Sequence, residues 1–307
     1  MAFSKLITIK KKVSHKFFDF TSKRALHLKA LDRSGSLEKG LCILSMLCKR
    51  DFFQYLVSIY SFHQFLKPEK IVIVNDGSLE PQHLALLKEK VPGIEILNGS
   101  DFYDDKLPSY TSWQRLQAIE SYISRFYVIQ LDADIFSRHD LDEVLSAYKN
   151  NLSFILGTRE SQLITVQETT ERSTKRNSKS THVQHLAELN MHRLEALGLN
   201  HYVRGCAGFS GFAQGSFDKL TLIKISAAMF DSIGDKWREW GSEQVCTNIL
   251  IANQYNAIIL PLEYYDSVER YSEELKLIHF IGPLRFKKFI YNKLATRYIN
   301  GQLNELK

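Results

Sequence analysis

The stretch from Phe126 to Phe136 is the feature that most constrains this chain. Its first six residues are mainly apolar and predict a buried strand. Two acids, Asp132 and Asp134, follow at alternate positions. Side chains two apart on a strand point the same way, so both carboxylates can converge on one hard cation, which prefers oxygen ligands. Such a cation would let the pair bind phosphate groups that the acids alone repel. A strand followed by an acidic turn is the structural alternative.

The segments before this stretch alternate between strand and helix patterns. Gly40 to Leu47 is an apolar strand pattern, Asp51 to Phe65 has helical apolar spacing with Asp51 as a cap, and Ile71 to Val74 is β-branched. A strand, helix and strand within about 35 residues predict a right-handed crossover and a parallel sheet. The sequence therefore predicts an α/β fold, in which ligands bind at the carboxyl ends of the strands.

Two later segments carry weaker signals. Residues 158–184 are rich in Ser, Thr, Gln, Glu, Lys and Arg, which predicts a long polar loop that is either a mobile lid or solvated filler. Gly205 to Ala213 reads as a strand with three glycines. Glycine within a strand indicates the close approach of a ligand or of another backbone, or a bulge in a packed sheet.

Composition narrows the class of protein. The chain has 307 residues, of which 44% are hydrophobic, and no apolar run approaches the ~20 residues of a membrane span. The lysine-rich start lacks a long apolar stretch, so we expect no secretory signal. The four cysteines have no C-x-x-C spacing, which favours reduced core thiols and a cytoplasmic protein over disulfides or zinc.

Charge divides the chain into three parts. Of the net charge of +6, the first 31 residues carry +7 and the last 25 carry +5, so the remainder carries −6. We expect a basic N-terminal arm over 1–39, a catalytic domain over 40–282 and a basic aromatic tail over 283–307. Basic ends suggest an anionic membrane surface as partner, peripherally on the inner face, and the alternative is a tail helix packed on the domain. No nucleic-acid reader motif accompanies these ends, so we expect no nucleic acid partner.

Four motifs occur in a recognisable order: Val74 to Ser78, Leu131 to Asp134, Gly241 to Asn248 and His279 to Arg285. Together they resemble the GT-A fold glycosyltransferases that use nucleotide sugars, in particular family 8, the glycogenin-like and bacterial galactosyltransferase-like group. The resemblance implies a Rossmann-like, mixed and mainly parallel sheet flanked by helices.

The resemblance also implies a metal centre. In that family the Asp-x-Asp motif and the histidine of an H-x-x-G-x-x-K element bind the metal, and the cation of that element holds the diphosphate. Here these residues are Asp132, Asp134, His279 and Arg285. Two carboxylates and an imidazole suit Mn²⁺, or else Mg²⁺, and arginine can bind phosphate oxygens bidentately. A lone histidine on an apolar strip is otherwise usually a core residue.

Further residues are implied to contact the donor. Asp76 can accept hydrogen bonds from a base or ribose beside the turn at Gly77, although Asn-Asp-Gly-Ser is also ordinary turn chemistry. Glu243 and Gln244 are similar to the helix start that faces the transferred sugar. Glu243 would be the catalytic or sugar-orienting acid, or alternatively a first-turn acid interacting with the helix dipole.

Two more positions come from the alignment with the family. Arg115 lies where the family tends to carry a cation on the helix before its metal strand, which makes it a candidate donor contact. Gly208 lies on the strand that would face the sugar. The family often places Asn or Ser before that glycine, whereas Cys206 and Ala207 occupy those places here.

These inferences converge on a metal-dependent glycosyltransferase that moves a hexose from a nucleotide-diphosphate sugar, a UDP-sugar, to a glycan or lipid-linked acceptor. The resemblance favours retention of configuration, while Glu243 as an inverting base stays open. A non-catalytic nucleotide-sugar-binding module is one alternative. A haloacid-dehalogenase-like phosphatase is the other, but it needs a later Gly-Asp-x-x-x-Asp, and Gly234-Asp235 lacks the second acid.

Overall fold

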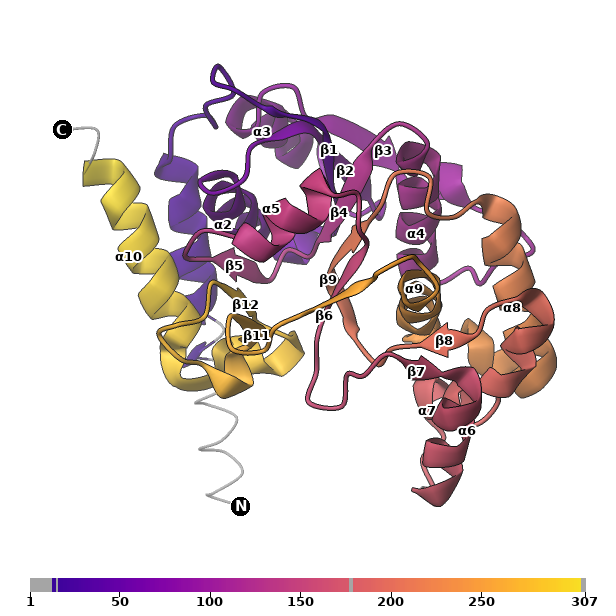
Figure 1. Ribbon diagram of the computed structural model, residues 1–307. Coiled ribbons are helices and arrows are strands. Elements are labelled where there is room, and N and C mark those ends of the chain that lie inside the picture. Colours follow the sequence, from indigo (N-terminus) through magenta and orange to yellow (C-terminus); the bar gives the residue numbers. More distant parts are fainter. Residues whose placement is uncertain (1–12, 15, 177–178, 305–307) are drawn as a thin grey trace, which may run out of the picture.

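The computed structural model describes residues 13–14, 16–176 and 179–304 (Figure 1). A seven-stranded sheet in the order β10-β6-β9-β4-β1-β2-β3 forms its centre. All neighbouring pairs are parallel except the two that β9 makes with β4 and β6. The strands are β1 Glu38–Leu47, β2 Pro68–Asn75, β3 Glu95–Asn98, β4 Tyr127–Leu131, β6 Phe154–Leu156, β9 Cys206–Phe212 and β10 Ile258–Leu260. The predicted α/β architecture with a mixed, mainly parallel sheet is confirmed.

Helices cover both faces of this sheet (Figure 1). The α-helices among the described residues include α2 Phe52–His63, α3 Pro81–Lys90, α4 Thr111–Ile123, α5 Asp142–Lys149, α6 Val166–Lys175, α7 Val183–Glu188, α8 Lys219–Ile233, α9 Ser242–Ala252 and α10 Ile290–Asn304. Successive strand residues enter opposite cores: Leu41 and Ile43 pack with α2, whereas Cys42 and Leu44 pack with α4. This follows from the two-residue period of a strand buried on both faces.

A second, three-stranded sheet determines where the chain's last histidine lies. It has the order β11-β12-β5, with β5 at Ile135–Ser137, β11 at Tyr265–Ser267 and β12 at Leu277–His279. The antiparallel register of β12 and β5 places His279 opposite Ile135. The backbone N–H of Phe280 donates to the carbonyl of Asp134 at 2.8 Å. The end of β12 is thereby fixed against the segment that carries Asp132 and Asp134.

The stretch predicted as one strand from Phe126 to Phe136 is instead two short strands. β4 ends at Leu131 in the large sheet, and β5 begins at Ile135 in the small one. Asp132 and Asp134 lie in the turn between them, where the N–H of Ile135 donates to the carbonyl of Asp132 at 3.2 Å. The strand-based reason for their convergence was therefore wrong, because a tight turn between two sheets directs both carboxylates.

The segment 158–184, expected to be a loop, is partly regular. Strand β7 Ile164–Thr165 pairs with β8 His201–Tyr202, and α6 follows directly. The Thr165 hydroxyl caps α6 by accepting from the N–H of Glu168 at 3.0 Å. Only a narrow stripe of α6 is buried, formed by Val166, Thr169 and Ser173, so polar composition concealed the helix. Movement of this segment as a lid stays a prediction.

The basic ends pack together on the α/β domain. Residues 16–23 are helical and lie beside α10, as the indigo and yellow ribbons of Figure 1 show. The amide of Asn292 donates to the carbonyl of Phe17 at 3.0 Å, and the rings of Phe18 and Tyr291 are 4.5 Å apart. Tyr291 is also part of the domain's hydrophobic core. Across the described parts of the chain, no helix combines the length and apolarity needed to cross a membrane.

Candidate active site

A cavity of about 1170 Å³ opens at the carboxyl ends of β1, β2 and β4. This is the location that the predicted parallel sheet indicated. Nine of the ten sequence-predicted site residues line it: Asp76, Arg115, Asp132, Asp134, Gly208, Glu243, Gln244, His279 and Arg285. Gly77 is the exception. It supports the turn beside Asp76 with φ of +93°, a conformation that only glycine adopts freely.

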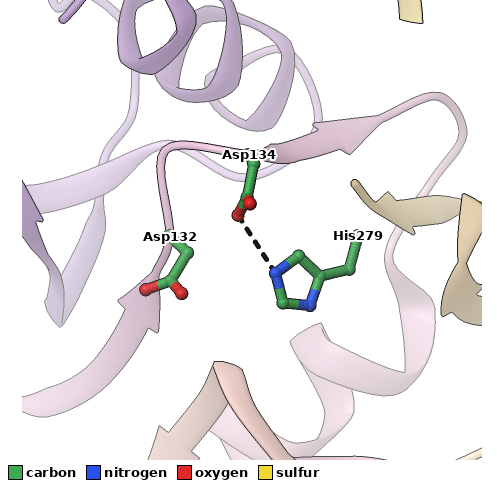
Figure 2. Close-up of side chains that lie close together, drawn as sticks. All are labelled: Asp132, Asp134 and His279. Atoms are coloured by element: carbon green, nitrogen blue, oxygen red, sulfur yellow. Dashed lines mark hydrogen bonds and ion pairs between the residues drawn. The ribbon is translucent and has the colours of Figure 1, made fainter. Parts of the chain in front are cut away.

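Three potential metal ligands converge in this cavity. Asp132, Asp134 and His279 each offer a ligand atom, and these atoms lie within 4.8 Å of one another. Figure 2 shows the Asp134 carboxylate and the imidazole facing each other, with Asp134 Oδ1 at 3.0 Å from His279 Nε2. Two oxygens and one imidazole nitrogen form a donor set that fits Mn²⁺ or Mg²⁺. The predicted spatial convergence of the three residues is confirmed.

The absence of a side chain at Gly208 leaves room for the imidazole of His279. Gly208 lies on β9, and its carbonyl accepts from the N–H of Asp132 at 2.9 Å. A Cβ at this position would meet Cε1 of His279 at 2.3 Å and Asp132 Oδ2 at 3.0 Å. Gly205 and Gly211 instead approach neighbouring strand β6, whose pairing with β9 has a register shift. Of the three glycines, Gly208 makes room for the candidate metal ligands.

Two effects set the pKa values of the cluster: burial disfavours the charged form of each side chain, and nearby opposite charges favour it. Burial disfavours the imidazolium of His279, but the Asp134 carboxylate outweighs it and raises the pKa of His279 well above its usual value. Burial likewise opposes ionisation of Asp134, yet His279 and Arg285 hold the pKa of Asp134 below its usual value. Burial, with the neighbouring charge of Asp134, raises the pKa of Asp132 despite Arg115. A divalent cation would compete for the same lone pairs that hold the His279 proton.

Two arginines bracket the acids. Arg285 donates to Asp134 Oδ2 at 2.9 Å and to Asp51 Oδ1 at 3.0 Å. Arg115 donates to Asp132 Oδ1 at 2.6 Å and to Glu243 Oε2 at 3.2 Å. Both guanidinium groups line the cavity, where phosphate oxygens could compete with these carboxylates for their donors.

Glu243 is buried in the first turn of α9 rather than being a solvated helix-end acid. One of its oxygens accepts from Thr247 Oγ1 at 3.2 Å, and both accept from Arg115. The neighbouring Gln244 is held by the N–H of Ala207, which donates to Gln244 Oε1 at 3.4 Å. Asp76 is at the other side of the cavity, where its Oδ1 accepts from the Ser78 N–H at 2.9 Å.

Several residues that line the cavity were not predicted from the sequence to be part of the site. Asp51, expected as a helix cap, makes no capping hydrogen bond and instead contacts Arg285. All four cysteines are free, as predicted, and Cys42 and Cys246 are buried. Cys48 and Cys206 are not core thiols, because both are half-buried and line the cavity. Cys206 Sγ is 3.4 Å from His279 Nδ1, and no local sequence pattern predicts this contact.

Comparison of the fold decides the architectural class. No family model and no curated protein matches this sequence. The solved structure of the galactosyltransferase LgtC with donor and acceptor sugar analogs is similar, with a TM-score of 0.53, 12% identity, and coverage of 85% of this chain and 99% of LgtC. The chain has the GT-A fold. An active-site mutant of LgtC gives a TM-score of 0.51 at 11% identity, covering 85% of this chain and 95% of that one.

One further match is to a longer protein. The apo structure of the bifunctional glycosyltransferase WbbM gives a TM-score of 0.49 at 15% identity. The comparison covers 89% of this chain and 53% of WbbM, so the chain spans about half the length of that protein. At these identities the two LgtC comparisons establish the fold alone, the GT-A fold that the motifs had indicated.

Proposed function

We propose that this protein is a metal-dependent glycosyltransferase that moves a hexose from a nucleotide-diphosphate sugar, a UDP-sugar, to a glycan or lipid-linked acceptor. One observation carries the proposal: Asp132, Asp134 and His279 present ligand atoms within 4.8 Å of one another on the wall of a large cavity. The cavity lies at the carboxyl ends of the parallel strands of a GT-A fold, where donors bind in α/β proteins. The described glycosyltransferase structures of that fold support the same activity.

In this proposal the triad holds Mn²⁺, or else Mg²⁺, which would stabilise the charge that develops on the departing diphosphate. Arg285 would exchange its bonds to Asp51 and Asp134 for phosphate oxygens. Its planar fork can bind two oxygens of one phosphate group. Asp76 would accept hydrogen bonds from the base or ribose, because it lines the cavity beside β2.

Glu243 is proposed to position the donor sugar rather than to act as a general base. Its two oxygens already accept hydrogen bonds from Arg115 and Thr247, so the carboxylate is held in one orientation. Gln244, the next residue, lines the same wall together with Gly208. An acid engaged in this way favours transfer with retention of configuration over activation of an acceptor by Glu243.

Metal-dependent nucleotide binding tests the proposal. Calorimetric titration with UDP should show binding with Mn²⁺ and a loss of affinity of more than about tenfold in chelator, which corresponds to ~1.4 kcal/mol. D134N should remove the effect of the metal, while D235N should not, because Asp235 is 93% exposed at its side chain and does not line the cavity. Equal UDP affinity with and without metal would contradict the assignment.

Two further assays address the alternatives. Asp235, the acid of the partial Gly-Asp element, is exposed and does not line the cavity, so we expect no turnover of p-nitrophenyl phosphate. Slow Mn²⁺-dependent hydrolysis of a UDP-hexose to UDP would distinguish an enzyme from a binding module. Binding of UDP-hexose without any release of UDP, with or without acceptors, would favour the module.

We also propose that the packed ends contact an anionic membrane. Phe17, Phe20 and Phe289 expose 48%, 65% and 45% of their surfaces, and the rings of Phe17 and Phe289 are 5.8 Å apart. Exposed Lys16 and Lys23 lie on the same helical segment as Phe17 and Phe20. Aromatic side chains beside cations are typical of interfacial helices.

Vesicle sedimentation can separate this membrane proposal from a solvated helix pair. F20S should weaken binding to vesicles containing phosphatidylglycerol, and binding to neutral phosphatidylcholine vesicles should be weak throughout. Y255S is a matched control, because Tyr255 is an exposed aromatic residue in the loop after α9. Equal sedimentation with both vesicle types would end the membrane proposal. Point variants are preferable to removal of the tail, since α10 contributes Tyr291 and Leu294 to the core.

A further inference from the structure

Trp240 has an unusual environment for a tryptophan. The chain has three tryptophans. Trp113 and Trp237 are fully buried, whereas Trp240 is 66% exposed. Trp240 also lines the active-site cavity. Single exposed rings are common on protein surfaces, but a ring exposed at the edge of a cavity is available to a ligand that enters the cavity.

The exposed ring is carried by a firmly held piece of backbone. The side chain of Ser242, two residues on, accepts from the buried indole of Trp113 at 2.8 Å and donates to the carbonyl of Glu239 at 3.0 Å. Gly241 between them has φ of +100°. The ring of His182, from the start of α7, meets the Trp240 ring edge-on with centroids 5.8 Å apart. The indole is therefore presented in a defined position at low entropic cost to a ligand.

The position of Trp240 separates it from the nucleotide end of the cavity. Asp76 follows β2, which lies on one side of β4 in the sheet order. Trp240 directly precedes α9, which packs on β9, the strand on the other side of β4. Asp132 and Asp134 follow β4 and lie between the two, with His279 brought beside them by β12. The cavity volume of about 1170 Å³ also exceeds the 300–1,000 Å³ of a typical single-ligand pocket.

We propose that Trp240 and His182 form a stacking platform for a pyranose ring of the acceptor, next to the sugar-facing acid Glu243. The C–H face of a pyranose is apolar while its edge carries hydroxyl groups, so one ring can cover an indole and still keep its hydroxyl groups hydrated or hydrogen-bonded. The inference rests on the proposed glycosyltransferase function and assigns the acceptor a sugar, rather than a lipid chain, at this wall.

Fluorescence gives a direct readout, because Trp240 is the exposed indole among the three. Iodide should quench its emission in the full-length protein, and lactose, maltose or cellobiose should protect it from iodide. Glycerol, which offers hydroxyl groups without a ring face, should not protect it. The protection can be measured without UDP or metal, so its result is independent of donor binding.

Kinetics supply the second readout. With a UDP-hexose, Mn²⁺ and the protecting disaccharide, W240A should raise the acceptor KM by about tenfold, equivalent to ~1.4 kcal/mol, and shift the donor KM much less. W240F keeps an aromatic face and should fall between wild type and W240A. Y255A, which removes another exposed aromatic residue, is the matched control.

The outcomes separate this inference from the proposed function. Mn²⁺-dependent UDP binding without protection of Trp240 by any disaccharide would overturn the platform and leave the glycosyltransferase assignment intact. Protection by dodecyl chains in detergent but not by disaccharides would also overturn it, in favour of a lipid contact. Disaccharide protection in a protein that binds no UDP would support the sugar platform while removing the proposed transferase activity.

Discussion

Arg115 joins Asp132 to Glu243. One nitrogen of its guanidinium donates to Asp132 Oδ1 at 2.6 Å, and the other donates to Glu243 Oε2 at 3.2 Å. Arg115 is 8% exposed and Glu243 is 4% exposed, so the bonds form largely out of water. One cation thus fixes the turn after β4, which carries a candidate metal ligand, relative to α9, which carries Glu243, the acid proposed to face the donor sugar. The planar fork of arginine suits this bridge, and a lysine ammonium does not.

Replacement of Arg115 should therefore destabilise the fold as well as the site. R115M leaves the buried Glu243 carboxylate without its ion partner, which costs about 3–5 kcal/mol in the free energy of unfolding. R115K should recover part of this loss, because one ammonium can reach one carboxylate but cannot bridge two in a planar geometry. Urea denaturation measures both.

K175M is the control for this comparison. Lys175 and Glu171 form an exposed pair with 4.0 Å between Nζ and Oε2, and such pairs contribute between 0 and about 1 kcal/mol. A loss for R115M no larger than that for K175M would show that the bridge does not stabilise the fold.

A single methyl group at Gly208 should weaken metal binding strongly. A Cβ there would lie 2.3 Å from Cε1 and 2.8 Å from Nε2 of His279, so the G208A protein must move the imidazole away from Asp134. We expect the Mn²⁺ affinity, measured by electron paramagnetic resonance, to fall by about 10- to 100-fold or more, since even indirect disturbance of ligands has that effect.

G301A provides the matched glycine control. Gly301 lies in α10, and a Cβ added there would meet nothing within 4 Å, so alanine should stabilise the helix by up to about 1 kcal/mol without changing metal affinity. Unchanged Mn²⁺ binding in G208A would mean that His279 is not a ligand.

Cys206 should act as a positioning residue for His279. Its Sγ is 3.4 Å from Nδ1, while Nε2 faces Asp134. When Nε2 is a metal ligand, Nδ1 carries the proton and needs an acceptor, which the sulfur provides. C206A should lower Mn²⁺ affinity by about 10- to 100-fold, and C206S should retain more of it because the hydroxyl can also accept.

Two measurements separate positioning by Cys206 from general damage to the cavity. In the Mg²⁺-bound protein, the ¹⁵N shifts of His279 should show a protonated Nδ1 in wild type and a smaller fraction of this form in C206A. C48A should leave them unchanged, because Cys48 lines the same cavity but contacts Asp51 instead. Identical histidine spectra for wild type and C206A would contradict the positioning role.

His63 should contribute to acid destabilisation. Burial, assisted by Arg33 and Lys67, lowers the pKa of His63 from 6.5 to about 4. Between these pH values the unfolded chain binds a proton that the folded chain does not, so stability falls as the pH is lowered from 6.5 toward 4. The loss approaches ~3 kcal/mol for a shift of this size. H63L should show a flatter dependence of unfolding free energy on pH.

The comparison of slopes requires a second histidine variant. His139 is exposed, so H139L should retain the wild-type slope between pH 6.5 and 4. The slope is obtained from urea denaturation at several pH values for all three proteins. A slope for H63L equal to that of wild type would show that the pKa of His63 is not lowered in the folded protein.

Local sequence patterns determined the α/β architecture and the pair of acids. Alternate apolar residues in β1 and β2 enter opposite cores, a property that each strand carries in its own sequence. Asp132 and Asp134 were recognisable because they follow an apolar strand, although a turn rather than a continuous strand brings them together. Helix α6 was missed because its buried stripe contains Thr169 and Ser173, which have no hydrophobic signature.

The completed site depended on contacts between distant segments. His279 reaches Asp134 because β12 pairs with β5, and the family resemblance rather than any local pattern had indicated it. The contact of Cys206 with His279 and the exposure of Trp240 became visible only in the folded chain. A strand or turn is encoded by neighbours in sequence, so its residues can be read directly. Ligand geometry and ring exposure depend on which segments pack together, and that choice is made by the free energy of the whole fold.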